Sequence, residues 1–200
     1  MTILGYFLLV PTLLFNNDVE TAAHKKQTVE LTETVRTVVL IRHAKSSHEN
    51  PEWIDFERPL GERGYRDAPF MGQKIFEKGI EFDLIIASPS QRTTETIQFI
   101  CKEIDYPIEK ILWDESVYLS STENLLKIIR NLDSDIKTVA IVGHNPSMTE
   151  TANILQKTEK IENVPTSGIV SVSFSLKDWS DLKPKKGKFN FFIYPKMYAK

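Results

Sequence analysis

The fold is decided by residues 38–47, which read VVLIRHAKSS. The first four residues are apolar and rich in β-branched side chains, which is typical of a strand buried on both faces of a parallel sheet. The sequence then changes abruptly to Arg42 and His43, followed by a polar segment. This stretch therefore predicts a central strand whose carboxyl end carries two chemically active side chains.

Similar apolar runs recur along the chain and alternate with segments of helical periodicity. We predict further strands at 82–87, 108–113, 138–142, 169–174 and 189–194, and helices near 64–79, at 91–104, from Thr122 as cap, and from Pro146. Alternating strands and helices predict an α/β fold, a three-layer αβα sandwich around a mostly parallel central sheet. The last two strands are candidates for an antiparallel edge.

The composition is that of an ordinary globular domain, with 41% hydrophobic and 26% charged residues in 200. Lys plus Arg total 25 and Asp plus Glu total 27, so the chain lacks the excess of basic residues that would indicate binding to nucleic acid. Any bound anion must be held by a few focused cations. The single cysteine, Cys101, excludes an internal disulfide and is interpreted as a core residue.

The first residues are apolar, and residues 16–36 that follow are polar and resemble a linker. Residues 1–15 contain no lysine or arginine, include Pro11, and are short for a membrane span. Three interpretations stand: an extension from an upstream start codon with the functional start near Val35, a signal or anchor segment, or a docked helix. We favour the first, which divides the chain into an extension at 1–36 and one domain at 37–200 and predicts a cytoplasmic protein.

Polar signals follow three of the buried strands. The first strand leads into Arg42 and His43, the second into SPSQR at 88–92, and the strand at 138–142 into GHNP at 143–146. The carboxyl ends of parallel strands share one edge of a sheet, where α/β proteins bind ligands. Arginine offers a planar fork of donors to phosphate oxygens, and a neutral histidine nitrogen can attack phosphorus. Helices beginning near Ser90 and Pro146 would add backbone N–H groups.

Each signal has a simpler interpretation when it is taken alone. A single histidine at a strand end is usually structural, Arg92 fits a surface helix, and a Ser-Pro pair at 88–89 fits the end of a strand. The combination at three strand ends is what indicates a phosphate site. The sequence has no HExxH motif, no metal-ligand spacing and no glycine-rich nucleotide loop, so neither a metal nor a cofactor is expected.

Four motifs in order resemble the SixA-like phosphohistidine phosphatase branch of the histidine phosphatase superfamily. RHAKSS at 42–47 resembles the RHG-type signature, and it is followed by DFERPL at 55–60 with ERG at 62–64, SPSQRT at 88–93 and VGHNP at 142–146. The resemblance covers about residues 37–174. It implies a phosphoglycerate-mutase-like fold.

The resemblance also implies roles for individual residues. His43 would be the nucleophile that becomes phosphorylated, and Arg42, Arg92 and His144 would hold the phosphoryl group. Arg58 would support the pocket rim and contact substrate, although a structural ion pair with an acid such as Asp55 explains it equally well.

The general acid is left open between two carboxyl groups, Glu115 and Asp55, because the sequence does not show which has a raised pKa. Ser88 is a further candidate for substrate binding or for orienting the site, or it is a simple strand-end cap. The small polar turn at 166–167 is a weaker candidate for contact with the pocket.

The predicted function is a metal-independent phosphatase that works through a phosphohistidine intermediate, with phosphohistidine in proteins as substrate. The alternatives are a small-molecule phosphomonoesterase and a non-catalytic phosphoprotein-binding module. The short connections between Arg92 and His144 favour an open pocket, which suits a protein substrate. A phosphorylated protein or a small phosphate is therefore the expected partner. Binding to nucleic acid is not expected, and binding to a membrane is expected only if the apolar N-terminal segment is an anchor.

Overall fold

The apolar run forms β1 (Thr34–Arg42), a central strand of the sheet. β1 pairs in parallel with β4 (Thr138–Gly143) and antiparallel with β5 (Ile169–Leu176). Residues 38–41 are fully buried, and alternate members pack into the hydrophobic clusters on opposite faces of the sheet. The continuous apolar run thus arises because both faces of this strand are covered.

The computed structural model describes residues 32–199 of the chain, and its sheet contains six strands in the order β3-β2-β4-β1-β5-β6. The remaining strands are β2 (Leu84–Ala87), β3 (Leu112–Trp113) and β6 (Lys188–Ile193). β3, β2, β4 and β1 run parallel, whereas β5 and β6 form the predicted antiparallel edge. The interpretations of residues 1–31 lie outside the described residues.

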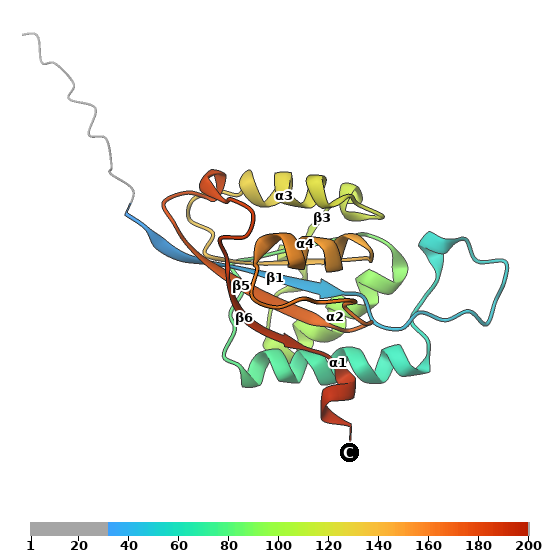
Figure 1. Cartoon of the computed structure of the whole chain (residues 1–200). Coiled ribbons are helices and arrows are strands. Elements are labelled where there is room, and N and C mark those ends of the chain that lie inside the picture. Colours follow the sequence, from blue (N-terminus) through green and yellow to red (C-terminus); the bar gives the residue numbers. More distant parts are fainter. Residues whose placement is uncertain (1–31, 200) are drawn as a thin grey trace, which may run out of the picture. The chain divides into compact units, whose positions relative to one another are not determined.

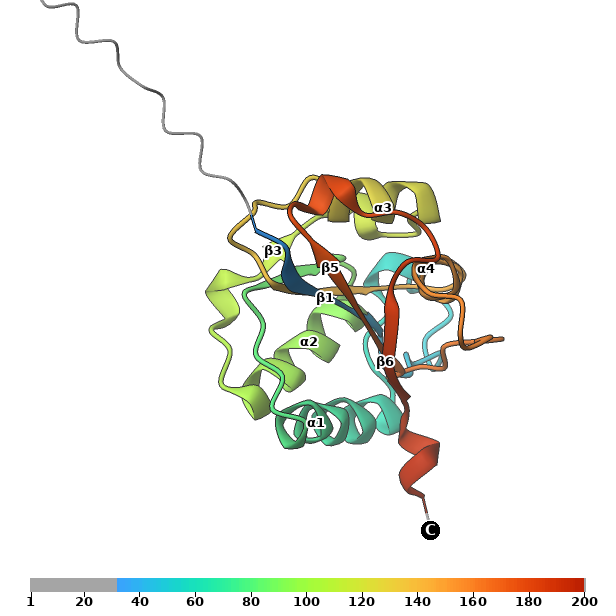
Figure 2. The same cartoon turned by 60° about the vertical axis from the view of Figure 1, so that its left-hand side comes forward.

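Two helices cover each face of the sheet, as Figures 1 and 2 show. α1 (Glu62–Glu77) and α2 (Gln91–Ile104) pack on one face, and α3 (Thr122–Arg130) and α4 (Ser147–Leu155) pack on the other. The three-layer αβα sandwich predicted from the sequence is confirmed. Within residues 32–199 no helix is both long enough and apolar enough to cross a membrane.

The hydrophobic core contains Cys101, as the sequence predicts. Its side chain is 1% exposed in the cluster between α1, α2 and the sheet, and burial raises the pKa of its thiol to about 12. A thiol with so high a pKa stays protonated and unreactive at neutral pH.

Three local predictions differ from the structure. The expected strand at 108–113 begins as a 3₁₀ turn (Ile108–Lys110), so only Leu112–Trp113 pair with β2. Helix α3 is capped by Ser121 rather than Thr122, because the Ser121 hydroxyl accepts from the Asn124 N–H at 3.1 Å. β1 begins at Thr34, within the segment interpreted as a linker.

The early start of β1 buries a charge that the sequence pattern does not reveal. Arg36 is 1% exposed and donates to three backbone carbonyls, those of Ser134, Ile136 and Lys177, at 2.8–3.0 Å. Its guanidinium also lies 5.5 Å from the Trp179 ring centre. These bonds satisfy both terminal nitrogens of the buried guanidinium, while its Nε has no hydrogen-bond partner among the described residues.

Candidate active site

The three polar strand ends converge at the carboxyl edge of the parallel strands. Arg42 is in register with Gly143, and the neighbouring β2 ends level with β4. The His43 N–H donates to the Gly143 carbonyl at 3.1 Å, and the Ser88 N–H donates to the Val142 carbonyl at 3.0 Å. The rings of His43 and His144 consequently lie 5.0 Å apart.

His43 is held in a single tautomer. His43 is only 8% exposed, and its Nδ1 lies 2.7 Å from the carbonyl oxygen of Ala44. A carbonyl only accepts, so Nδ1 carries the proton and Nε2 keeps a lone pair. The Arg92 Nε–H donates to that Nε2 at 3.3 Å, which agrees with this assignment. His43 therefore presents an unprotonated Nε2.

The surroundings of His43 keep its ring uncharged. Burial lowers the pKa of His43 to about 3, and the charges of His144, Arg92 and Arg42 add to this, against the opposing effect of the hydrogen bond to Ala44. The ring is neutral at pH 7 as a result, which a nitrogen nucleophile requires.

His144 has the opposite tautomer. Its Nδ1 accepts from the Arg92 guanidinium at 3.3 Å, so Nε2 carries the proton and donates to the Ser88 hydroxyl at 2.9 Å. Burial lowers the pKa of His144 to about 3, and the charge of Arg92 contributes in the same direction. Ser88 is fully buried, and its hydroxyl contacts this ring and also accepts from the Ser90 N–H at 3.4 Å, so both interpretations of Ser88, orienting residue and strand-end cap, fit its contacts.

Arg92 lies in the first turn of α2 and is 3% exposed. One terminal nitrogen of its guanidinium pairs with the Asp55 carboxylate at 2.7 Å, and the other terminal nitrogen donates to the Asp55 backbone carbonyl. Thr96, one turn later, accepts from the Ala44 N–H at 2.9 Å and donates to the Arg92 carbonyl at 2.6 Å. The bond from Ala44 attaches α2 to residues 43–47, here called the nucleophile loop because the sequence analysis predicts His43 as the nucleophile.

Arg42 brings a second guanidinium to the same edge. One of its nitrogens donates to the Val164 carbonyl at 2.8 Å, while its buried Nε has no hydrogen-bond partner among the described residues. Burial and the nearby charge of Arg92 lower the pKa of Arg42. Two guanidiniums share this edge with a single ion-paired carboxylate, so the site has an excess of positive charge suited to an anion.

Asp55 is an ionised anchor in this arrangement. Its carboxylate accepts from Arg92 at 2.7 Å, from the Tyr118 hydroxyl at 2.8 Å and from Arg58 at 2.6 Å. Burial acts to raise the pKa of Asp55, but the hydrogen bonds from Tyr118 and Arg92 and the charges of both arginines outweigh it and hold the pKa at about 2. Arg58 makes the ion pair with Asp55 that its structural interpretation predicted, and it also contacts His48 at 2.9 Å.

The other candidates for the general acid and pocket are Glu115 and the turn at 166–167. Glu115 is exposed in a 3₁₀ turn (Glu115–Val117), and within residues 32–199 its carboxylate makes no hydrogen bond or ion pair. In the turn at 166–167, the Ser167 N–H donates to the carbonyls of Arg42 and His43 at 3.2 and 3.1 Å. That turn supports the backbone at His43, and its Ser167 hydroxyl is buried with no hydrogen-bond partner among the described residues.

Tyr118 belongs to the site although the sequence analysis did not select it. Its ring lies edge-on to His144 with centres 5.3 Å apart, and edge-on to Phe56 at 5.0 Å. The only signal in the sequence is its position three residues after Glu115. Among residues 32–199, no three His, Cys, Asp or Glu side chains are gathered where they would hold a metal ion.

Residues 38–114, which include His43 and Arg92, match the family described as the histidine phosphatase superfamily (branch 1). Over this segment the chain is similar to the histidine phosphatase superfamily. This confirms the resemblance of the motifs, and the match covers the nucleophile loop and the arginine at the start of α2.

Relatives within the superfamily include protein phosphatases and a mutase. The chain is 38% identical over 105 residues to the mitochondrial serine/threonine-protein phosphatase Pgam5 of Drosophila ananassae, which covers 52% of this chain but only 32% of that protein. The protein histidine phosphatase SixA complexed with tungstate superposes with a TM-score of 0.71 at 18% identity, covering 82% of this chain and 99% of SixA. A phosphoglycerate mutase of Bacillus anthracis gives 0.55 at 14%, covering 76% and 96%, which confirms the phosphoglycerate-mutase-like fold.

Proposed function

We propose that the protein is a phosphatase that carries a phosphoryl group on Nε2 of His43, needs no metal ion, and acts on phosphohistidine in proteins. The observation that carries this proposal is the bond from His43 Nδ1–H to the Ala44 carbonyl at 2.7 Å. It leaves Nε2 as the nucleophilic nitrogen, in a buried ring beside two guanidiniums.

The reaction takes place in two transfers. In the first, the Nε2 lone pair attacks phosphorus in line, the Nε2–P bond forms, and the bond from phosphorus to the donor nitrogen breaks as that nitrogen takes up a proton. In the second, a water oxygen attacks phosphorus, the O–P bond forms as the Nε2–P bond breaks, and inorganic phosphate leaves; the proton that the water loses goes to solvent and balances the one taken up in the first transfer. Arg42 and Arg92 hold the phosphoryl oxygens in both transfers, and His144 joins them by donating from Nδ1 once the negative charge of the bound phosphoryl group has favoured its protonation. Positioning and charge stabilisation supply most of the catalysis.

The protonation states favour phosphohistidine over a phosphate ester as the donor. An alkoxide leaving group needs a placed acid with a raised pKa. The pKa of Asp55 is about 2, and its carboxylate is occupied by two arginines and a tyrosine. Glu115 is exposed, and its carboxylate makes no hydrogen bond or ion pair among the described residues. A phosphoramidate bond to histidine is more labile and needs less help from an acid.

The relatives support a protein substrate. SixA is described as a protein histidine phosphatase and binds tungstate, a tetrahedral oxyanion like phosphate. Pgam5 is described as a serine/threonine-protein phosphatase. Both act on phosphorylated proteins, and they differ in the residue that carries the phosphate.

The experiment compares phosphate release from a histidine-phosphorylated protein and from an aryl phosphate, with EDTA present. The variants are His43→Ala and, as a matched control, His48→Ala, which removes an exposed histidine from the adjacent loop. We expect the wild type and His48→Ala to release phosphate, and His43→Ala to release none. An alkaline quench of the wild type during turnover should trap a phosphohistidine on the protein.

Each other outcome identifies a different function. Turnover of the aryl phosphate with little release from the phosphoprotein would make the protein a small-molecule phosphomonoesterase. Binding of phosphate without turnover of either substrate would make it a phosphoprotein-binding module. Activity abolished by EDTA and restored by a divalent metal would overturn the metal-free mechanism.

A further inference from the structure

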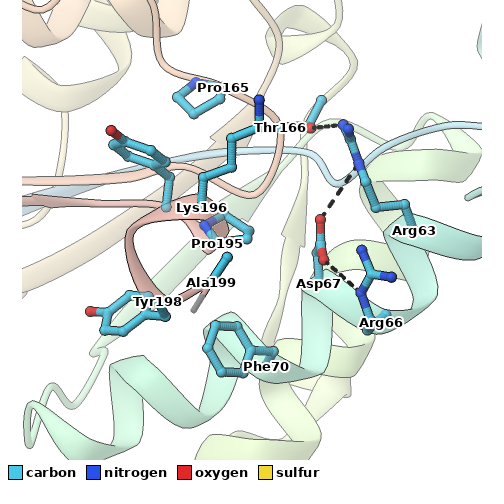
Figure 3. Close-up of a pocket in the computed structure, with 11 residues that line it drawn as sticks. Arg63, Arg66, Asp67, Phe70, Pro165, Thr166, Pro195, Lys196, Tyr198 and Ala199 are labelled. Carbon is cyan, nitrogen blue, oxygen red and sulfur yellow. Dashed lines mark hydrogen bonds and ion pairs between the residues drawn. The ribbon is translucent and has the colours of Figure 1, made fainter.

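A hollow of about 440 Å³ lies beside the candidate active site, between α1 and the 3₁₀ helix η5 (Pro195–Tyr198). Figure 3 shows this surface, called here the α1–η5 hollow. Its aromatic side includes Tyr198 edge-on to Phe70, with ring centres 5.6 Å apart. Tyr198 is 39% exposed, so an incoming side chain can reach this aromatic surface.

One short segment connects the hollow to the nucleophile. The Val164 carbonyl accepts from the Arg42 guanidinium at 2.8 Å, and the Ser167 N–H donates to the His43 carbonyl at 3.1 Å. The two residues between them, Pro165 and Thr166, line the hollow. A group seated in the hollow is therefore separated from the phosphoryl site by the width of this single segment.

The charges around the hollow are mostly positive. Arg63, Arg66 and Lys196 line it together with one carboxylate, Asp67, which lies 3.6 Å from the Arg63 guanidinium and 3.3 Å from that of Arg66. Arg63 also donates to the Thr166 hydroxyl at 3.0 Å. Lys196 is exposed and has no ion-pair partner among residues 32–199.

Lys196 and the pair of Phe70 and Tyr198 lie at different ends of the hollow, and Lys74 Nζ lies 5.2 and 5.1 Å from the centres of these two rings. Figure 3 shows the Lys196 side chain extending toward Pro165 and Thr166, on the side to which Arg63 also reaches, while Phe70 and Tyr198 lie at the other end. An occupant with a carboxylate and an aromatic ring would satisfy both parts. Aromatic rings bury a large apolar area and pack edge-on, and carboxylates pair with exposed cations.

We propose that the α1–η5 hollow docks the residues that flank the phosphorylated residue of a protein substrate, and that it selects a flank with an acidic and an aromatic side chain. This inference rests on the proposed function for the identity of the phosphoryl group. A small phosphate ester would occupy the catalytic edge and leave the hollow empty. The hollow therefore distinguishes protein substrates from small ones and one protein substrate from another.

The test uses fluorescent peptides that carry a non-hydrolysable phosphonate analogue of phosphohistidine, with binding followed by anisotropy. Three peptides differ only in their flank, which is Asp-Phe, Lys-Phe or Asp-Ala. The protein variants are Lys196→Glu, Tyr198→Ala and the control Lys186→Glu. Lys186 is an exposed lysine that precedes β6, whereas Lys196 follows it, so the control places the same charge change at the opposite end of this strand.

We expect the wild type to bind the Asp-Phe peptide about fivefold more tightly than the Lys-Phe peptide, as for an exposed ion pair. Lys196→Glu reverses that preference, and Lys186→Glu keeps it. Tyr198→Ala removes the difference between the Asp-Phe and Asp-Ala peptides. Equal binding of all three peptides by the wild type, or an equal loss of preference in both lysine variants, would overturn the proposal.

Hydrolysis measured in parallel separates this inference from the proposed function. Lys196→Glu should keep the kcat/KM of the wild type on an aryl phosphate, because its side chain lies outside the cluster of His43, Arg92 and His144. A wild type that shows the peptide preference but hydrolyses nothing would refute the chemistry and retain the docking site. A wild type that hydrolyses phosphohistidine but shows no preference among the peptides would retain the proposed chemistry and refute the docking site.

Discussion

Acidification from pH 7 to pH 5 should destabilise the protein through its two active-site histidines. His43 and His144 are 8% and 2% exposed, and burial and the nearby positive charges lower the pKa of each to about 3. In the unfolded chain a histidine titrates near pH 6.5. Between these two values the unfolded state binds more protons than the folded state, so the free energy of unfolding falls as the pH falls.

The size of the effect follows from the two pKa values. At pH 5 an unfolded histidine is almost fully protonated and the folded one almost fully neutral, which costs about 2 kcal/mol per residue, against about 0.2 kcal/mol at pH 7. The two residues together should remove about 4 kcal/mol between pH 7 and pH 5, a large share of the stability of an ordinary domain. Asp55 does not enter this window, because its pKa falls from 3.8 to about 2 and its contribution is lost only at lower pH.

The assay is urea unfolding at pH 7, 6 and 5 in buffers without phosphate, for the wild type and for His43→Asn, His144→Asn and His48→Asn. Each of the first two variants should lose about half of the pH dependence. His48 is exposed, so His48→Asn should retain most of it. A wild type whose stability is the same at pH 5 as at pH 7, or an equal pH dependence in all four proteins, would refute the neutral, buried state of these rings.

Three further predictions concern the contacts that support the site. Ser88→Ala removes the acceptor of the His144 Nε2–H and should lower both the unfolding free energy by about 1–2 kcal/mol and kcat/KM by about tenfold; unchanged values in urea unfolding and aryl phosphate turnover would contradict the orienting role. Tyr118→Phe removes a hydrogen bond to the Asp55 carboxylate and should raise the pKa of Asp55 in a carbon-13 NMR titration, whereas a lower pKa would contradict the assigned donor. Gly64→Ala brings a Cβ against a carbonyl of the nucleophile loop and should cost about 1–3 kcal/mol in urea unfolding; a stability equal to the wild type would show that α1 can move away.

The sequence predicts the catalytic edge because the signals there are local. Apolar runs identify the buried strands, and the polar residues that determine the chemistry follow those runs directly. The rule that parallel strands share a carboxyl edge then brings His43, Arg92 and His144 together without further information. The structure has these residues in contact, with Arg92 bonded to both rings.

The remaining contacts depend on the paths of loops, which the sequence pattern does not encode. Asp55 meets Arg92 across 37 positions, and Tyr118 meets Asp55 across 63. Tyr118 carries no charge and lies in no motif, so only its contact with Asp55 and His144 shows that it belongs to the site. Arg36 breaks the apolar pattern of β1 because its charge is satisfied by carbonyls from distant turns.

Arg92 connects the geometry of the site to its proposed reaction. Its Nε–H donates to the lone pair of His43 Nε2, the nitrogen that attacks phosphorus under the proposed function. Its terminal nitrogens are shared between Asp55 and His144. Under the proposed function, an arriving phosphoryl group offers stronger, charged acceptors than a neutral imidazole. The Arg92 Nε–H then changes its hydrogen-bond acceptor from His43 Nε2 to a phosphoryl oxygen. The nucleophilic nitrogen becomes available only when its target is bound, while the ion pair with Asp55 keeps the guanidinium in place.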